Sequence, residues 1–185
     1  MLKKPAAARA ADEESLIICQ QVGDRLGVAR ALNNLGIELY MGGQYGEAER
    51  YHLDSLDIKR TIGDDGGMVH SYHQLGRTVL AVGDGDQAWD YFERGLKTAV
   101  SIQSAPLMLM CLVGIAPLLV TRSSVLFALT VTAVALHHPA LSHYLRAEAQ
   151  AVYTQLVEEI VIPPSAAQPT LDELVRRVLA LGQCS

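Results

Sequence analysis

The histidines are the residues whose type and spacing could most readily do chemistry in this chain. His70 and His73 stand three positions apart, and His137, His138 and His143 form a second group. Histidine binds zinc, but zinc sites combine it with further His, Cys or carboxylate ligands at supporting spacing. No such ligands stand near either group in the sequence. We therefore expect solvent-facing or groove-lining histidines, with no bound metal and no cofactor.

Other sequence patterns that support catalysis or nucleotide binding are missing. The chain has no phosphate-binding loop of the GxxxxGK[ST] kind, and its segments GDDGG and GDGD indicate turns. The segment DDGGM lacks the ligand positions of a calcium loop. Cys111 lies in an apolar run, where a thiol is expected to be inert. No Ser-His-Asp arrangement can be argued from spacing, so we predict that the protein is not an enzyme.

Composition limits the partners and the compartment. The 185 residues suffice for one domain with a real core, and 50% of them are hydrophobic. A net charge of -5 argues against direct binding of nucleic acid, which needs a basic surface. Cys19, Cys111 and Cys184 are odd in number and widely spaced, which favours a reducing cytoplasm over a disulfide framework. The N-terminal segment lacks the apolar core of a secretory signal.

The elements that position these residues follow from an internal repeat. The segment LNNLGIELYMGGQYGEAERYHLDSL, which begins at Leu32, matches YHQLGRTVLAVGDGDQAWDYFERGL, which begins forty positions later at Tyr72, without a gap. A fixed period of this size indicates a helical solenoid. The matched pairs are Leu35 and Leu75, Gly36 and Gly76, Gly43 and Gly83, Ala48 and Ala88, Tyr51 and Tyr91, and Leu56 and Leu96.

Each repeat predicts two amphipathic helices joined by a glycine turn. Leu32, Leu35, Gly36 and Leu39 form one stripe at helical spacing, and a second stripe begins at Ala48 after the turn MGGQYG. A glycine inside a helix costs about 1 kcal/mol relative to alanine. We interpret Gly36 and Gly76 as places where a neighbouring helix must come very close.

These residues resemble the tetratricopeptide repeat: a bulky residue, Leu-Gly, and an alanine about twelve positions after the glycine. The period is forty here against 34 in that family, and a long repeat with LNNLG resembles the helical arrays of bacterial signal-transduction ATPases and transcriptional regulators. The resemblance implies an all-α fold, a right-handed superhelical array of antiparallel helical hairpins with a C-terminal capping helix. We predict repeats at 1–138, divided as a half repeat 5–27 and repeats 28–66, 67–105 and 106–138, then capping helices at 139–185 with a proline linker at 162–169.

The helices are predicted at ranges that follow this register. We expect one unpaired helix first, so that the chain corresponds to the C-terminal part of a longer array. Thr170 and Glu173 form a capping box for the last helix. The expected ranges are Pro5–Val22, Val28–Gly42, Tyr45–Ile62, Gly67–Val82, Gly85–Ile102, Pro106–Thr121, Ser124–His137, Ala140–Val161 and Leu171–Leu181.

The resemblance also implies a binding groove, because the first helices of successive repeats line a concave face in that family. Amide side chains there can donate to and accept from a peptide backbone, and arginines can meet an acidic group. In the third repeat the same face is apolar, with Met110, Val113, Gly114 and Pro117. The predicted groove residues are Arg30, Asn33, Asn34, Ile37, His70, His73, Gln74 and Arg77.

We therefore predict a non-catalytic protein-protein interaction scaffold from a bacterial signalling or transcription-regulatory protein. Its partner is a protein or peptide, which could be another domain of the same parent chain. The apolar third repeat could also mediate self-association.

A membrane-anchored helical protein is the alternative. The runs 98–121 and 123–145 carry no charged residue and are separated by Arg122 alone, so a membrane hairpin at 98–145 is conceivable. The forty-residue register passes through both runs, which favours a buried third repeat instead.

Overall fold

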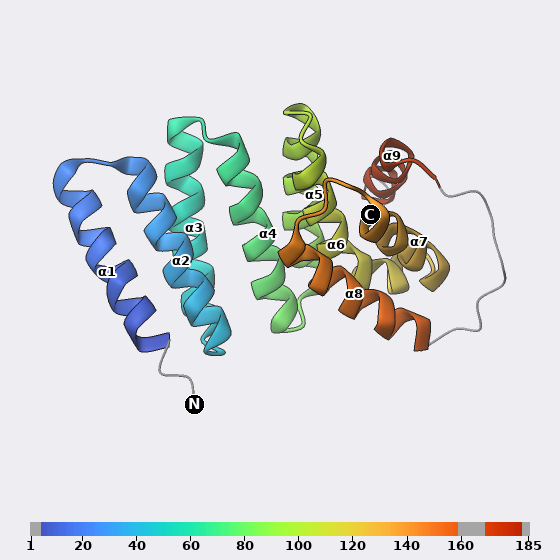
Figure 1. Cartoon of the computed structure of the whole chain (residues 1–185), viewed down its shortest axis with the longest axis horizontal. Helices are drawn as coiled ribbons and strands as arrows, with labels where there is room; N and C mark the ends of the chain where they lie inside the picture. Colours follow the sequence, from blue (N-terminus) through green and yellow to red (C-terminus); the bar gives the residue numbers. More distant parts are fainter. Residues whose placement is uncertain (1–4, 159–168, 183–185) are drawn as a thin grey trace. The chain divides into compact units, whose positions relative to one another are not determined.

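The computed structural model describes residues 5–158 and 169–182. The regular elements in these ranges are all α-helices that follow one another through short turns, so the predicted all-α array of helical hairpins is confirmed (Figure 1). The helices are α1 (Pro5–Val22), α2 (Arg25–Met41), α3 (Tyr45–Ile62), α4 (Asp65–Ala81), α5 (Gly85–Ser101), α6 (Ala105–Arg122), α7 (Val125–His137), α8 (His143–Glu158) and α9 (Leu171–Leu181).

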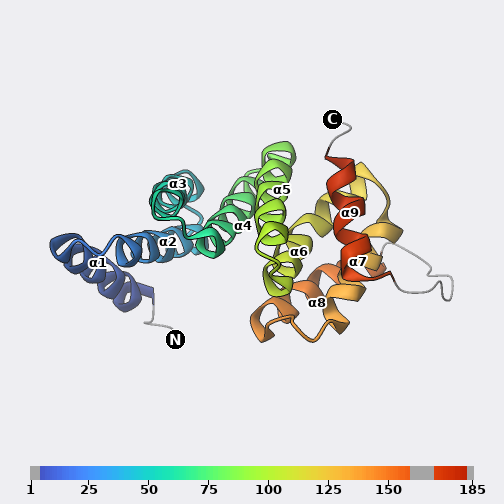
Figure 2. The same cartoon turned by 90° about the horizontal axis from the view of Figure 1, so that it is seen from above.

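The chain divides into two compact units, residues 1–88 and residues 89–185. In the first unit, α1 packs on α2, α2 on α3, and α3 on α4, and Figure 1 shows these four helices side by side in chain order. In the second unit, α6 packs on α7 and α7 on α8, while α9 lies against α6 and α7 (Figure 2). The predicted division at 138, with its repeat boundaries, stays a prediction.

The turns between the helices recur every twenty residues. A left-handed backbone at the end of a helix turns the chain back on itself and is easiest for glycine, which lacks a Cβ. Glycine occupies this left-handed position in turns within a repeat and in turns between repeats. Glutamine occupies it in the turn after α5. The residues with positive φ are Gly23 (73°), Gly43 (75°), Gly63 (72°), Gly83 (92°) and Gln103 (54°).

Aspartate caps move two helix starts from their predicted positions. The side chains of Asp24 and Asp64 accept hydrogen bonds from the backbone N–H groups of Gly27 and Gly67. Since the cap satisfies a free N–H of the first turn, α2 and α4 begin directly after it, at Arg25 and Asp65. The predicted starts, Val28 and Gly67, were therefore late by three and two residues.

The inner face of α3 holds the first unit together. His52, Ser55, Leu56 and Lys59 recur at helical spacing and are all buried. The Ser55 hydroxyl donates a 2.6 Å hydrogen bond to the carbonyl oxygen of Ala29 in α2. This bond satisfies a polar group inside the interface between the two helices.

The apolar run predicted as a third repeat forms α6 and α7 in the second unit. By length and composition α6 could cross a membrane, and 56% of its apolar window is buried inside the protein. The contacts of α6 with α7, α8 and α9, together with Phe92 of α5, contribute to this burial. With 13 residues, α7 is about 20 Å long, short of the roughly 30 Å of a bilayer core. The helix lengths therefore do not favour a membrane hairpin.

Three of the residues predicted to form an apolar groove face in α6 lie inside the protein. Met110 and Val113 are buried, and a Cβ on Gly114 would lie 2.5 Å from Cε1 of Phe92 in α5. Pro117 alone of this set is exposed. The predicted apolar end of the groove is therefore wrong, because these side chains pack in the core of the second unit. Self-association through this repeat stays a prediction.

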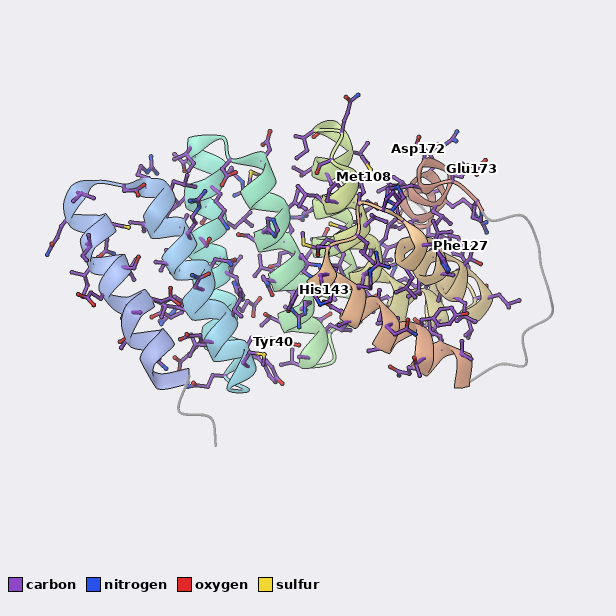
Figure 3. All side chains as sticks on the ribbon, viewed as in Figure 1. Tyr40, Met108, Phe127, His143, Asp172 and Glu173 are labelled. Atoms are coloured by element: carbon purple, nitrogen blue, oxygen red, sulfur yellow. The ribbon has the colours of Figure 1, made fainter. Side chains whose placement is uncertain are left out.

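The start of α8 differs from the predicted start. The helix predicted at Ala140–Val161 is α8, which begins three residues later at His143; residues 159–161 and most of the proline linker, 162–168, lie outside the described residues. The predicted capping box at the start of α9 is present, and Figure 3 shows Asp172 and Glu173 in its first turn. The Arg177 guanidinium lies 4.1 Å from the ring centroid of Phe127, which adds a contact between α9 and α7.

Candidate binding site

A pocket of about 530 Å³ opens in the first unit among α2, α3 and α4. Residues 30, 33, 34 and 37 of α2 recur at i, i+3, i+4 and i+7, so one face of the helix presents them together. Residues 70 and 74 of α4 share a face in the same way. The turn before α4 and the C-terminal half of α3 complete the wall. The lining residues are Arg30, Asn33, Asn34, Ile37, Lys59, Asp64, Gly66, Gly67, His70 and Gln74.

Six of the eight residues predicted for a groove line this pocket: Arg30, Asn33, Asn34, Ile37, His70 and Gln74. The other two, His73 and Arg77, do not. A residue three positions after His70 still neighbours it on the helix surface, but the His73 side chain is buried in the interior and does not reach the pocket. His73 is 2% exposed, and burial lowers its pKa to about 3.

Arg77 lies on the face of His70 but about 10 Å further along the axis of α4. Its guanidinium lies 4.9 Å from the ring centroid of Tyr40, a residue that Figure 3 places near the C-terminal end of α2. Stacking of this kind holds a guanidinium against an aromatic face. The predicted role of Arg77 in choosing an acidic partner stays a prediction.

Four lining residues were not predicted from the sequence: Lys59, Asp64, Gly66 and Gly67. Lys59 is the cation among them. It is 3% exposed, and its Nζ donates a 2.9 Å hydrogen bond to the hydroxyl of Ser71 in α4. Burial lowers the pKa of Lys59 to about 8; the nearby Asp64 carboxylate raises it and the Arg30 guanidinium lowers it. The forty-residue register could have indicated that Lys59 is buried, because the matching positions of the neighbouring repeats hold the small residues Cys19 and Ala99.

The amides of the pocket are only partly engaged within the protein. The Oδ1 atom of Asn33 is buried and has no hydrogen-bond partner among the described residues. The Nδ2 group of Asn34 donates a 3.0 Å hydrogen bond to Asp12 of α1, which fixes the orientation of that amide. Buried amide groups are almost always hydrogen-bonded. The orphaned acceptor of Asn33 therefore suits an N–H donor from a bound molecule.

The charges in the pocket favour one anionic group. Arg30 and Lys59 are cations at neutral pH, and Asp64 is an anion that also accepts the N–H of Gly67 at 2.9 Å. The pKa of His70 is lowered by burial and by the charge of Lys59, which keeps its imidazole neutral at pH 7. The lining thus carries one net positive charge, enough to attract a single carboxylate and too little for a dianion.

Two of the three histidines near the α7–α8 turn contact backbone groups of the protein. His138 Nδ1 accepts a hydrogen bond from the backbone N–H of Ala140, and His137 Nδ1 lies 2.8 Å from the carbonyl oxygen of Ala133. Across residues 5–158 and 169–182, no three His, Cys, Asp or Glu side chains group as metal ligands.

Comparison with known proteins finds a family for the first three helices. Residues 1–61 match the family model described as tetratricopeptide repeat. That range covers α1, α2 and nearly all of α3, and includes the α2 wall of the pocket. No curated protein matches the chain. The predicted resemblance to the tetratricopeptide repeat is therefore confirmed for these residues.

Proposed function

Because the chain contains tetratricopeptide repeats, which generally mediate protein–protein interaction, we propose that it is a non-catalytic scaffold that binds an extended peptide segment in the first-unit pocket. The segment can be a free peptide or an exposed stretch of a partner domain. The observation that carries this proposal is that six residues predicted to face a groove line one pocket together. They come from α2 and α4, the first helices of two successive repeats.

The recognition would combine backbone and side-chain contacts. The Asn33 acceptor and the Gln74 amide can bond to the N–H and C=O groups of an extended backbone, whatever its sequence. Arg30, which is exposed at the pocket, adds a charge-assisted hydrogen bond to an acidic side chain. A bond of this kind contributes roughly 1.5–3 kcal/mol, so Arg30 is expected to dominate the preference for acidic segments.

We further propose that the scaffold works in the cytoplasm as part of a bacterial signalling or transcription-regulatory protein. The forty-residue repeat and the LNNLG segment support this context by resemblance alone. The presence of an ATPase or DNA-binding domain in frame with this chain would support it, and a parent gene encoding only an unrelated domain would contradict it.

A peptide selection on the intact chain tests the binding proposal. A random-peptide phage library is selected on the immobilised protein, with counter-selection on an Arg30→Ala/Asn33→Ala variant. Selected peptides are then measured by fluorescence anisotropy against single variants. Arg50→Ala is the matched control, because Arg50 is an exposed α3 arginine that stacks on Tyr51 and does not line the pocket.

We expect peptides enriched in Asp or Glu that lose tenfold or more in affinity with Arg30→Ala and less than twofold with Arg50→Ala. Peptides that bind the double variant as well as the original would show that another surface is used. Failure to select any peptide from an extended library would contradict the proposed function.

A further inference from the structure

Lys59 and Ser71 form a polar pair at core positions of the repeat. Forty residues before Lys59 the chain has Cys19, and forty after it has Ala99; the positions matching Ser71 are Ala31 and Cys111. Three of these four counterparts are buried, and none is charged. At these two matching positions the neighbouring repeats have small uncharged side chains. Of the repeats compared, the one that borders the pocket has an ammonium group there.

The scaffold itself gains nothing from this lysine. Burying a charge costs free energy unless a partner of opposite charge compensates it. Among the described residues, Lys59 has no ion-pair partner within 4 Å, and its one hydrogen bond is to the neutral hydroxyl of Ser71. Asp64 is the carboxylate whose charge raises the pKa of Lys59, but its side chain caps α4 instead of pairing with the ammonium. A departure from the local pattern without a structural gain is the mark of a functional position.

We propose that Lys59 is the anchor for one carboxylate group, which enters the pocket and lies between the Lys59 ammonium on its floor and the Arg30 guanidinium at its opening. This inference rests on the proposed function, because the carboxylate would belong to the segment bound in the same pocket. The carboxylate supplies the opposite charge that the interior lacks, and Ser71 holds the ammonium in place by its hydrogen bond. Lys59 thereby selects an anion of single charge.

Capture of the carboxylate is coupled to the proton on Lys59. The groups that face this lysine are Arg30 from α2, Asp64 and His70 from the α4 side, and His52 from α3 itself. Both histidines have lowered pKa values and Arg30 stays charged, so above pH 7 Lys59 is the group among them that titrates. Since its pKa is about 8 in the empty pocket, affinity should be nearly constant between about pH 6 and pH 7, where the ligand is a carboxylate and Lys59 is protonated, and fall up to tenfold per pH unit above pH 8.

The carboxylate could come from a side chain, a chain terminus or a free small molecule, and three probes separate these sources. The first is a peptide pool with one fixed Glu, compared with the same pool carrying Gln. The second is a pool with a free C-terminal acid, compared with the C-terminal amide. The third is glutarate alone.

Lysine NMR on the intact chain gives the direct test. The chain has four lysines, Lys3, Lys4, Lys59 and Lys97, so ¹³Cε-labelled lysine gives few signals, and Lys59→Met assigns the one of interest. We expect the Lys59 signal to titrate near pH 8 without ligand and at least one unit higher with whichever probe binds. The other lysines should not respond.

Two variants separate an anchor from a structural residue. Lys59→Ala/Ser71→Ala reproduces the small side chains found at Ala99 and Ala31, and Lys59→Met keeps the volume without the charge. Both should unfold at equal or higher temperature than the original chain and bind the acidic probe at least tenfold more weakly, with no pH dependence above pH 8.

The outcomes distinguish this inference from the proposed function. Peptides that bind equally to both variants, and leave the Lys59 signal unchanged, would overturn the carboxylate anchor while leaving the groove intact. If no peptide binds, glutarate still decides the inference through the Lys59 signal; an unchanged titration at 100 mM glutarate, relative to chloride at the same ionic strength, would overturn it.

Discussion

The imidazole of His52 occupies the space that a side chain at position 36 would need. A Cβ added to Gly36 would lie 2.6 Å from Cε1 and 2.7 Å from Nδ1 of His52, far closer than two side chains pack. Both residues are buried, and His52 is 0% exposed. Position 36 therefore accommodates only a glycine beside the ring of His52 in the following helix.

We predict that Gly36→Ala lowers the free energy of unfolding by about 1–3 kcal/mol, because the buried ring cannot move aside without disturbing the core. Gly46→Ala is the matched control: a Cβ there meets nothing within 4 Å, so the change should stabilise α3 by about 0.5–1 kcal/mol. Urea unfolding of the two variants measures both values. Equal stability of both would contradict the close approach at Gly36.

The stability of the protein should fall in mild acid because of His52. Its pKa is lowered from 6.5 to about 4, mainly by burial and then by the charges of Lys59 and Arg77. Between these pH values the unfolded chain binds the proton and the folded chain does not, so the contribution of His52 to stability is lost as pH decreases from 6.5 to 4 and changes no further below that. The loss is on the order of a few kcal/mol.

Replacing His52 with Phe, the residue at the matching position 92, should remove part of this acid sensitivity. Thermal unfolding at pH 7 and pH 4.5 measures the difference for each protein. His70 and His73 also have lowered pKa values, so a smaller dependence should remain. A variant with undiminished acid sensitivity would show that His52 is not buried in its neutral form.

We predict that α1 exchanges its backbone amides faster than α2 and α3. Helix α3 packs against two neighbours, whereas α1 packs on α2 alone among the described residues, and Ile18 and Val22 on its outer face are 50% and 72% exposed. Repeats are stabilised by their neighbours, so a helix with one neighbour should fray. Hydrogen exchange followed by mass spectrometry measures this, and equal protection in α1 and α3 would count against it.

The turn at Gln103 offers a stabilising substitution. Gln103 has φ of 54°, in a position where the other turns use glycine. A left-handed backbone costs a residue with a Cβ roughly 1–2 kcal/mol, and glycine loses about 0.5–1 kcal/mol through its greater freedom when unfolded. Gln103→Gly should therefore raise the free energy of unfolding by about 0.5–1 kcal/mol. A lower stability in urea would show that the Gln103 side chain makes a contact of its own.

The helices could be predicted from the sequence because the forty-residue spacing of matching residues reveals the repeat. The forty-residue register predicted the three helices around the pocket, and α1, α3 and α9 begin and end at their predicted residues. Helix starts moved where a local cap decided them, as Asp24 and Asp64 do for α2 and α4. The apolar α6 face was misjudged because its residues are buried by packing within the second unit, which no pattern along one helix reveals.

Only the part of the candidate site that α2 and α4 contribute could be predicted from the sequence. Arg30, Asn34 and Gln74 follow from the helical face, whereas the burial of His73 depends on the rotation of α4 against α3. Lys59 was missed because lysine is almost always exposed, and its burial is seen only when the positions matching it in other repeats are compared. Spacing predicts which residues share a face, but packing decides which of them border an open pocket.

The affinity of a selected acidic peptide for the intact chain and for Arg30→Ala tests most directly whether the first-unit pocket is the binding site. We expect binding that weakens at least tenfold in Arg30→Ala, weakens less than twofold in Arg50→Ala, and is lost when the acidic residue of the peptide is replaced by its amide. Unchanged affinity in Arg30→Ala, with the peptide still bound to the same protein, would contradict the first-unit pocket as the binding site.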